Sequence, residues 1–290
     1  MTSPRSPLPL IAVVGPVPPK MFAAFVDHYR SHGVDDVLVA FHFTEHASPD
    51  RRAELLECCE QLVGRPVLVS TGPWHEHIHG DLRDHLRRRA GTGWHVLADV
   101  DEFHGYPRPP EELVAEAEAR GSRQVGGVLF DRVSADGALA DWAPEKGLDA
   151  SYPLGGFLTS RLLGGNPRKV VLAHSSLPLV LGSHYSPDGL PDDDLLVPVH
   201  HFKWTERVLP DLRRRVAEHS SGAWWEVTPA IRTEAAALLE HIENHDGRID
   251  VTDPGMSFQP ASVEHLPDRW AEESRDVAER YREYRRWSAT

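Results

Sequence analysis

The sequence predicts an α/β fold with a mostly parallel sheet that helices cover on both faces, followed by a helical C-terminal extension. Over the first two-thirds of the chain, short apolar runs typical of strands alternate with segments of helical periodicity. Repeated strand–helix units imply parallel strands, because each crossover helix returns the chain to its starting direction. No linker rich in Pro, Gly or Ser divides the chain. We therefore expect residues 1–215 to form the main domain and residues 216–290 to pack on it as the helical extension.

The first strand–helix unit covers residues 10–33. Residues 10–15 are apolar and predict a short strand, and Gly33 ends the helix that follows. The apolar face of this helix consists of Met21, Phe22, Phe25, Val26 and Tyr29. Because these side chains recur at helical spacing, we expect the sheet to bury them.

The next unit repeats the pattern. Residues 35–41 predict a second strand, and a helix follows with Ser48 as its N-cap, Pro49 in its first turn and Gly64 at its end. The later elements are predicted in the order strand, helix, strand, helix, strand: residues 65–72, 80–91, 94–98, 109–121 and 124–133. Three more strands are predicted within residues 168–174, 177–185 and 195–204, and the chain from Thr205 onward reads mostly as helix.

Composition narrows the setting. The chain has 290 residues, 40% of them hydrophobic and 26% charged, which is typical of a globular protein. Its formal net charge of −13 opposes general binding to nucleic acid or to an anionic membrane, because both need a basic face. No apolar run approaches the length of a membrane span, and the N-terminus lacks a signal-peptide core. Cys58 and Cys59 are adjacent, so we expect reduced thiols in a cytoplasmic protein.

The stretch "WHVLADVDEFHGYP" (residues 94–107) gathers acidic residues at the end of an apolar strand. Ligands of open α/β sheets bind outside the carboxyl ends of the strands, which is where this cluster is expected. Strand alternation would aim Asp99 and Asp101 to one side and Glu102 away from them. Two carboxylates on one side can share Mg²⁺ or Mn²⁺, and a diphosphate can complete the coordination. A surface loop that carries three acids is the alternative, because a bare D-x-D pattern occurs in many proteins.

Several segments together resemble bacterial glycosyltransferases of the GT-A fold, of the family 2 and family 92 type. The segments are "FAAFVDHYRSHGVDDVLVAFH", "WHVLADVDEFHGYP", "GGVLFDRVSADGAL", "RKVVLAHSSLPLVLGSH" and "VPVHHFKW", which span roughly residues 10–215. The resemblance implies transfer of a sugar from a nucleotide diphosphate donor, with a UDP-sugar favoured, to a small-molecule or glycan acceptor. It also implies inversion at the anomeric carbon. The late "VPVHHFKW" departs from the His-Tyr pair usual in these families.

The resemblance also implies roles for the two aspartates. Asp101 is expected to bind the Mn²⁺ or Mg²⁺ that bridges the donor's phosphates, and Asp99 to contact the ribose or the metal. A cation at this position neutralises the charge that develops on the leaving diphosphate. Two other readings stay open. A metal-dependent nucleotidyltransferase or phosphohydrolase would use the same carboxylates, and a nucleotide-binding interaction module would release no product.

Other candidates follow at later strand ends. Asp131 is a candidate general base and Arg132 a candidate phosphate contact, although a structural ion pair is the alternative for both. His184 is a second catalytic candidate. Alternation along residues 195–204 places His201 and Lys203 on one side, with Trp204 on the other, so we expect His201 as third metal ligand and Lys203 at the donor's phosphates. The resemblance agrees with a late histidine ligand.

A run of alternating histidines is the last candidate. His75, His77 and His79 would share one face of a strand and could bind zinc there. The run follows "VLVSTGP", so we expect a loop and the start of a helix, with hydrogen-bonded or solvated histidines. No H-E-x-x-H pattern supports a zinc hydrolase.

Overall fold

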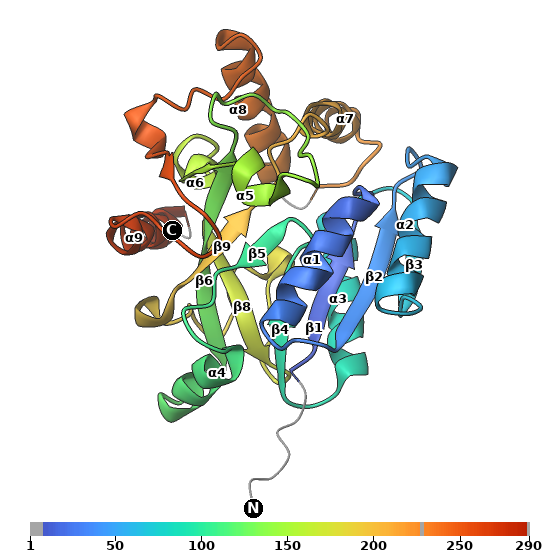
Figure 1. The fold of residues 1–290 in the computed structure, drawn as a ribbon, viewed down its shortest axis with the longest axis vertical. Coiled ribbons are helices and arrows are strands. Elements are labelled where there is room, and N and C mark those ends of the chain that lie inside the picture. Colours follow the sequence, from blue (N-terminus) through green and yellow to red (C-terminus); the bar gives the residue numbers. More distant parts are fainter. Residues whose placement is uncertain (1–7, 227–228, 289–290) are drawn as a thin grey trace, which may run out of the picture. The chain divides into compact units, whose positions relative to one another are not determined.

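The computed structural model describes residues 8–226 and 229–288 and divides the chain into two compact units (Figure 1). Unit 1 consists of Met1–Gly127 and Lys169–Val197, and unit 2 of Val128–Arg168 and Pro198–Thr290. The predicted boundary at residue 215 falls inside a helix of unit 2. Within the described residues no helix is both long and apolar enough to cross a membrane.

Unit 1 is built on an open sheet with strand order β8-β4-β1-β2-β3. These strands are β1 (Leu10–Val14), β2 (Val37–Phe43), β3 (Leu68–Thr71), β4 (Trp94–Leu97) and β8 (Arg168–His174). β1 pairs in parallel with both β2 and β4, and β2 pairs in parallel with β3. β8 runs antiparallel to β4. The predicted α/β class is confirmed, with parallel strands at the centre of this sheet.

Helices cover both faces of this sheet, and strand alternation explains how. The helices of unit 1 are α1 (Pro19–Ser31), α2 (Pro49–Leu62), α3 (Glu76–Ala90) and α4 (Pro110–Ala119). Ala40 packs in a cluster with Leu82 and Leu86 of α3, whereas the next residue, Phe41, has its ring 5.9 Å from that of Phe22 in α1. Figure 1 accordingly shows α1 and α3 on opposite sides of β1.

Most helix predictions hold. The predicted apolar face of α1 is buried in full. α2 begins with Ser48 at the N-cap position and Pro49 behind it, although the Ser48 side chain makes no capping bond. α3 starts at Glu76, four residues before the predicted start, and the His75 side chain caps it by accepting a hydrogen bond from the Ile78 N–H at 3.3 Å. The histidine run is therefore a loop and a helix start, as expected.

The strand predicted at residues 177–185 is wrong. The structure has a single short 3₁₀ turn there, η1 (Leu181–Ser183), inside an irregular segment. Arg83 of α3 donates to two carbonyls of this segment: its Nη1 lies 2.8 Å from the Val180 oxygen, and its Nη2 lies 3.2 Å from the Leu179 oxygen. An apolar segment can remain irregular when such side chains satisfy its backbone.

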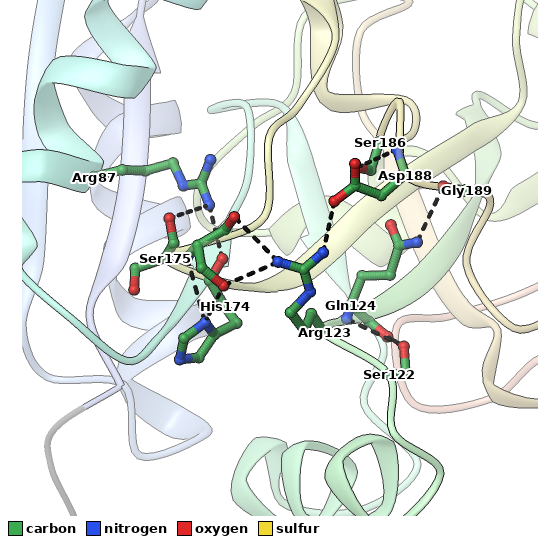
Figure 2. A network of polar contacts seen from close by, with 10 residues as sticks. Arg87, Ser122, Arg123, Gln124, His174, Ser175, Ser186, Asp188 and Gly189 are labelled. Atoms are coloured by element: carbon green, nitrogen blue, oxygen red, sulfur yellow. Dashed lines mark hydrogen bonds and ion pairs between the residues drawn. The ribbon is translucent and has the colours of Figure 1, made fainter.

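Figure 2 shows the polar network that secures the two ends of this segment within unit 1. Arg87 contacts the backbone at the end of β8, and Arg123 forms a 2.6 Å ion pair with Asp188. The Gln124 side chain donates to the Gly189 carbonyl at 3.1 Å. Both ends of the segment are thus attached to regular elements of unit 1.

Unit 2 contains the antiparallel strand order β10-β7-β6 and several helices. The strands are β6 (Gln124–Val133, which enters from unit 1), β7 (Leu154–Gly156), β9 (Val197–His201) and β10 (Gln259–Pro260). The helices are α5 (Gly147–Ser151), α6 (Leu158–Arg161), α7 (Val208–Ser221), α8 (Ala230–Asn244) and α9 (Trp270–Ser288). Short 3₁₀ turns lie at Asp193–Leu195 (η2, unit 1) and Pro254–Met256 (η3, unit 2). Leu212 of α7 and Leu238 of α8 share one core with Trp204, so the predicted helical C-terminal part is present.

Candidate functional site

The acidic stretch after β4 forms a β-turn. The Glu102 N–H donates to the Asp99 carbonyl at 2.9 Å, which places Val100 and Asp101 at the centre of the turn. A short strand, β5 (Glu102–His104), then begins. The expectation that Asp99 and Asp101 share a side while Glu102 points away is wrong, because alternation does not continue through a turn. The turn brings the Asp99 and Glu102 side chains together instead, and leaves the half-buried Asp101 at its centre.

Lys169 joins the two carboxylates. Its Nζ lies 2.9 Å from Asp99 Oδ2, 2.8 Å from Glu102 Oε1 and 3.0 Å from the Gly182 carbonyl oxygen. These contacts use all three N–H donors of the ammonium. Only 6% of the Lys169 side chain is exposed, against 32% for Asp99. The result is a buried cation whose anionic partner is still partly open to solvent.

Sequence reasoning missed Lys169. The pairing of Trp94 with His174 and of Val96 with Leu172 sets the antiparallel register of β4 and β8. Continued beyond the ladder, this register places Lys169 opposite Asp99. The signal in the sequence was a lysine near the start of an otherwise apolar strand, "RKVVLAH". A lysine there needs an anionic partner when the strand is buried.

His79 holds the other oxygen of Asp99. Its Nε2 lies 3.1 Å from Asp99 Oδ1, and it reaches that position from the first turns of α3. Burial by itself would raise the pKa of the Asp99 carboxyl, but Lys169 and His79 outweigh burial and hold that pKa well below its usual value. Burial would lower the pKa of Lys169, yet Asp99 and Glu102 raise it above its usual value. Both groups are therefore charged at neutral pH.

A loop over Lys169 completes this cluster. Arg83 Nη1 donates to the Ser183 hydroxyl at 3.0 Å as well as to the Val180 carbonyl, and Arg83 itself is 4% exposed. Gly182, whose carbonyl faces Lys169, has a φ of 71°, a left-handed value that favours glycine. His184 follows this turn directly. The catalytic role expected for His184 stays a prediction.

The cluster lines a cleft at the centre of the unit 1 sheet. The cleft is shallow, with a cavity volume of about 10 Å³, and is lined in part by Ile11, Val13, His79, Asp99, Lys169 and Ser183. β1 leads through α1 to β2 on one side, whereas β4 lies on the other side of β1. The strand order therefore changes direction between β1 and β4, and open α/β sheets bind ligands at such a point.

The predicted metal ligands fit this arrangement poorly. Both oxygens of Asp99 already have partners, Lys169 on one and His79 on the other, and a metal ion centred between Asp99 and Glu102 would have to displace a buried ammonium. Among the side chains that the structure describes, no group of three or more His, Cys, Asp and Glu is placed to hold a metal ion. The metal role expected of Asp99 stays a prediction. The metal roles of Asp101 and His201 stay predictions.

Asp131, the candidate base, lies in unit 2 and is 0% exposed. Its carboxylate accepts from the Thr159 N–H and hydroxyl, both at 2.7 Å, from His201 Nδ1 at 2.9 Å and from Trp204 Nε1 at 2.8 Å. Burial would raise the pKa of Asp131, but the bonds from His201 and Thr159 lower it. The base role stays a prediction, and these contacts favour a buried structural anion.

The alternation expected along residues 195–204 is wrong beyond β9. His201 and Trp204 were expected on opposite sides, yet both contact the Asp131 carboxylate. β9 ends at His201, and the chain then turns, with the Thr205 N–H donating to the Lys203 carbonyl at 2.9 Å. Lys203 Nζ lies 5.1 Å from the centre of the Trp204 ring. Its expected contact with the donor's phosphates stays a prediction.

Arg132 is also buried within unit 2. Its Nη2 donates to the carbonyls of Tyr152 and Ala261, both at 2.7 Å, and forms a 2.9 Å ion pair with Asp149. Its Nη1 lies 3.1 Å from His200 Nδ1. Arg132 thus joins several segments of unit 2, and the phosphate contact expected of it stays a prediction.

Comparison with known proteins gives little further guidance. No family model matches the sequence, and no curated protein matches it. Among solved structures, S. aureus TarS (residues 1–349) is 11% identical, with a TM-score of 0.30, 81% of this chain and 72% of that chain covered. The structure of the same protein in complex with UDP has a sequence identity of 10% and a TM-score of 0.29, with 81% of this chain and 72% of that chain covered. UDP-glucose pyrophosphorylase complexed with UDP-glucose has a sequence identity of 9% and a TM-score of 0.26, with 80% of this chain and 88% of that chain covered. At these TM-scores the likenesses carry no argument about what this chain does.

Proposed function

We propose that this chain is a GT-A-like glycosyltransferase that moves a sugar from a nucleoside diphosphate donor to a small-molecule or glycan acceptor. A UDP-sugar is the favoured donor. The observation that carries the proposal is the Asp99–Glu102 turn, which presents an oriented carboxylate to a cleft at the switch point of an open α/β sheet. The resemblance of "DVDEF" and its flanking segments to the GT-A glycosyltransferases supports the same reading.

Asp99 is the residue that we assign to the donor. Its carboxylate is ionised, is held on both oxygens and keeps 32% of its side chain exposed. A fixed carboxylate with lone pairs to spare accepts hydrogen bonds from hydroxyl groups, and a pair of ribose or sugar hydroxyls offers them. We therefore assign Asp99 to hydroxyl recognition rather than to metal binding.

In the proposed transfer, the bond between the anomeric carbon and the diphosphate oxygen breaks, and a bond to the acceptor oxygen forms. The acceptor hydroxyl loses its proton to a base, and the nucleoside diphosphate leaves with the bonding electron pair. Holding donor and acceptor in register supplies a large share of such catalysis, because it converts an encounter between two molecules into a single-complex step.

A ligand screen followed by product analysis tests the proposal. We expect a UDP-sugar to raise the Tm of the parent, and incubation with an acceptor to release nucleoside diphosphate. Asp99→Asn should lose most of the Tm shift, whereas Asp27→Asn, which changes an exposed aspartate of α1, should keep it. Release of pyrophosphate or inorganic phosphate would instead identify a nucleotidyltransferase or phosphohydrolase. Binding without any product would identify a nucleotide-binding module.

A further inference from the structure

The contacts of Lys169 are those of a cation in an oxygen cage. Two carboxylate oxygens and one carbonyl oxygen converge on Nζ at 2.8–3.0 Å, from Asp99, Glu102 and Gly182. They come from the turn after β4 and from the loop at η1, so the ammonium connects segments that are far apart in the sequence. The cage is shielded, since 6% of the Lys169 side chain and 3% of the Glu102 side chain are exposed.

The same three oxygens would suit a divalent cation. Carboxylate and carbonyl oxygens are the ligands that Mg²⁺, Mn²⁺ and Ca²⁺ prefer, at metal–oxygen distances of about 2.0–2.6 Å. Each oxygen would need to move inward by less than about 1 Å to meet such an ion. A metal ion and the lysine ammonium therefore compete for one position. The ammonium has the advantage of being attached to the chain, and displacing it would leave a buried charge without a partner.

We propose that Lys169 is a built-in cation: it fills the position between Asp99 and Glu102 that a divalent ion would otherwise occupy, so these carboxylates bind no metal in the native protein. The turn is then held in its ligand-binding shape without a cofactor. The built-in cation does not depend on the proposed transferase activity. Only its consequence for catalysis, that Asp99 would not be a metal ligand, rests on that proposed function.

Removing the lysine should convert this cage into a metal site. Lys169→Ala leaves two buried carboxylates without compensation, and we expect its Tm to fall by roughly 10 °C or more in the presence of EDTA. Millimolar Mn²⁺ or Ca²⁺ should restore several degrees, because an ion that binds only the folded state raises Tm. The parent should show no Tm difference between EDTA and either ion. Lys146→Ala, which removes an exposed lysine at the start of α5, should behave as the parent does.

Two results would overturn the proposal: a folded Lys169→Ala protein that neither ion stabilises, or a parent that EDTA destabilises. If Lys169→Ala does not fold under any condition, Mn²⁺ binding to the parent, followed by electron paramagnetic resonance, decides the matter. Mn²⁺ bound tightly by the parent and lost in Asp99→Asn contradicts a built-in cation, and no binding dependent on Asp99 supports it. These measurements contain no nucleotide, so failure of the transferase proposal would leave their outcome unchanged.

Discussion

Two carboxylates, Asp99 in unit 1 and Asp131 in unit 2, differ in their exposure and in the partners that keep them ionised. Asp99 has a lysine ammonium as its main partner and keeps about a third of its side chain exposed. Asp131 has no exposure and accepts from a histidine, a tryptophan and a threonine within its own unit. Hydrogen bonds from neighbouring groups suffice to keep the buried Asp131 carboxylate ionised, but its burial leaves no exposed surface that a ligand could contact. The comparison favours Asp99 over Asp131 as the aspartate that a small molecule can reach.

The largest effect should come from Asp131→Ala. It removes the acceptor for four donor contacts in a fully buried place, and we expect a loss of about 3–5 kcal/mol in the free energy of unfolding. Urea titration measures the loss. Asp211→Ala, at a half-exposed position on α7, should change stability by less than about 0.5 kcal/mol. An Asp131→Ala protein as stable as this control would contradict a structural role for Asp131 and would favour its role as a general base.

As the pH falls, unit 1 should lose stability before the Asp99 and Asp131 carboxylates are protonated. Burial lowers the pKa of His95 in β4, and likewise that of His28 in α1, to about 4. Below the unfolded pKa of about 6.5 the unfolded chain binds more protons, so stability falls as the pH drops from there toward 4. Each of the two histidines accounts for up to about 3 kcal/mol of this loss.

Amide hydrogen exchange at pH 5 tests this expectation, with protection of β1 and β4 compared between pH 5 and pH 7. His95→Phe should flatten the pH dependence, because it removes one titrating group from the buried strand. Asp99 and Asp131 behave differently, since their folded pKa values are lowered. Their stabilisation is complete above about pH 4 and is lost only as the pH falls through the folded values. Equal protection at both pH values would show that the two histidines do not control acid stability.

A smaller change in stability is expected for Asp99→Asn. Lys169 keeps Glu102 and the Gly182 carbonyl as partners, so we expect a loss of about 1–2 kcal/mol, together with the loss of donor binding described above. Urea titration and ligand-induced Tm shifts, measured on one preparation, separate the two effects. A stability loss as large as that of Asp131→Ala would mean that Asp99 too is chiefly structural.

The smallest effect on stability should come from Asp101→Asn. Asp101 lies at the centre of the turn, half-buried, where neutralisation relieves repulsion from Asp99 and Glu102. We expect the Tm without metal to be unchanged or slightly higher. If the metal role implied by the family resemblance is right, the variant still loses Mn²⁺-dependent binding of a nucleotide diphosphate. Parental binding in Asp101→Asn, with and without Mn²⁺, would exclude that role.

Local pattern was enough for most of the fold. The spacing of apolar residues located α1 and its buried face, and the acidic stretch was found at the carboxyl end of β4. Two errors arose where period-two alternation was carried past the end of a strand, after Leu97 and after His201, and a third where the apolar run at residues 177–185 was taken for a strand. The partner of Asp99 was out of reach for another reason. The contact joins residues 70 positions apart, and it depends on strand order and register, which no local pattern encodes.

The placement of Lys169 on an antiparallel strand has a consequence for how the protein is made. The chain leaves unit 1 after Gly127 and returns to it only at Lys169, so the acidic turn emerges from the ribosome well before its cation. Contacts of such sequence separation are slow to form, and a nascent chain of the first 127 residues lacks this one altogether. A truncated protein that ends before β8 would carry an anionic turn without its lysine partner. The cleft can form only after the segment between Gly127 and Lys169 has been synthesised.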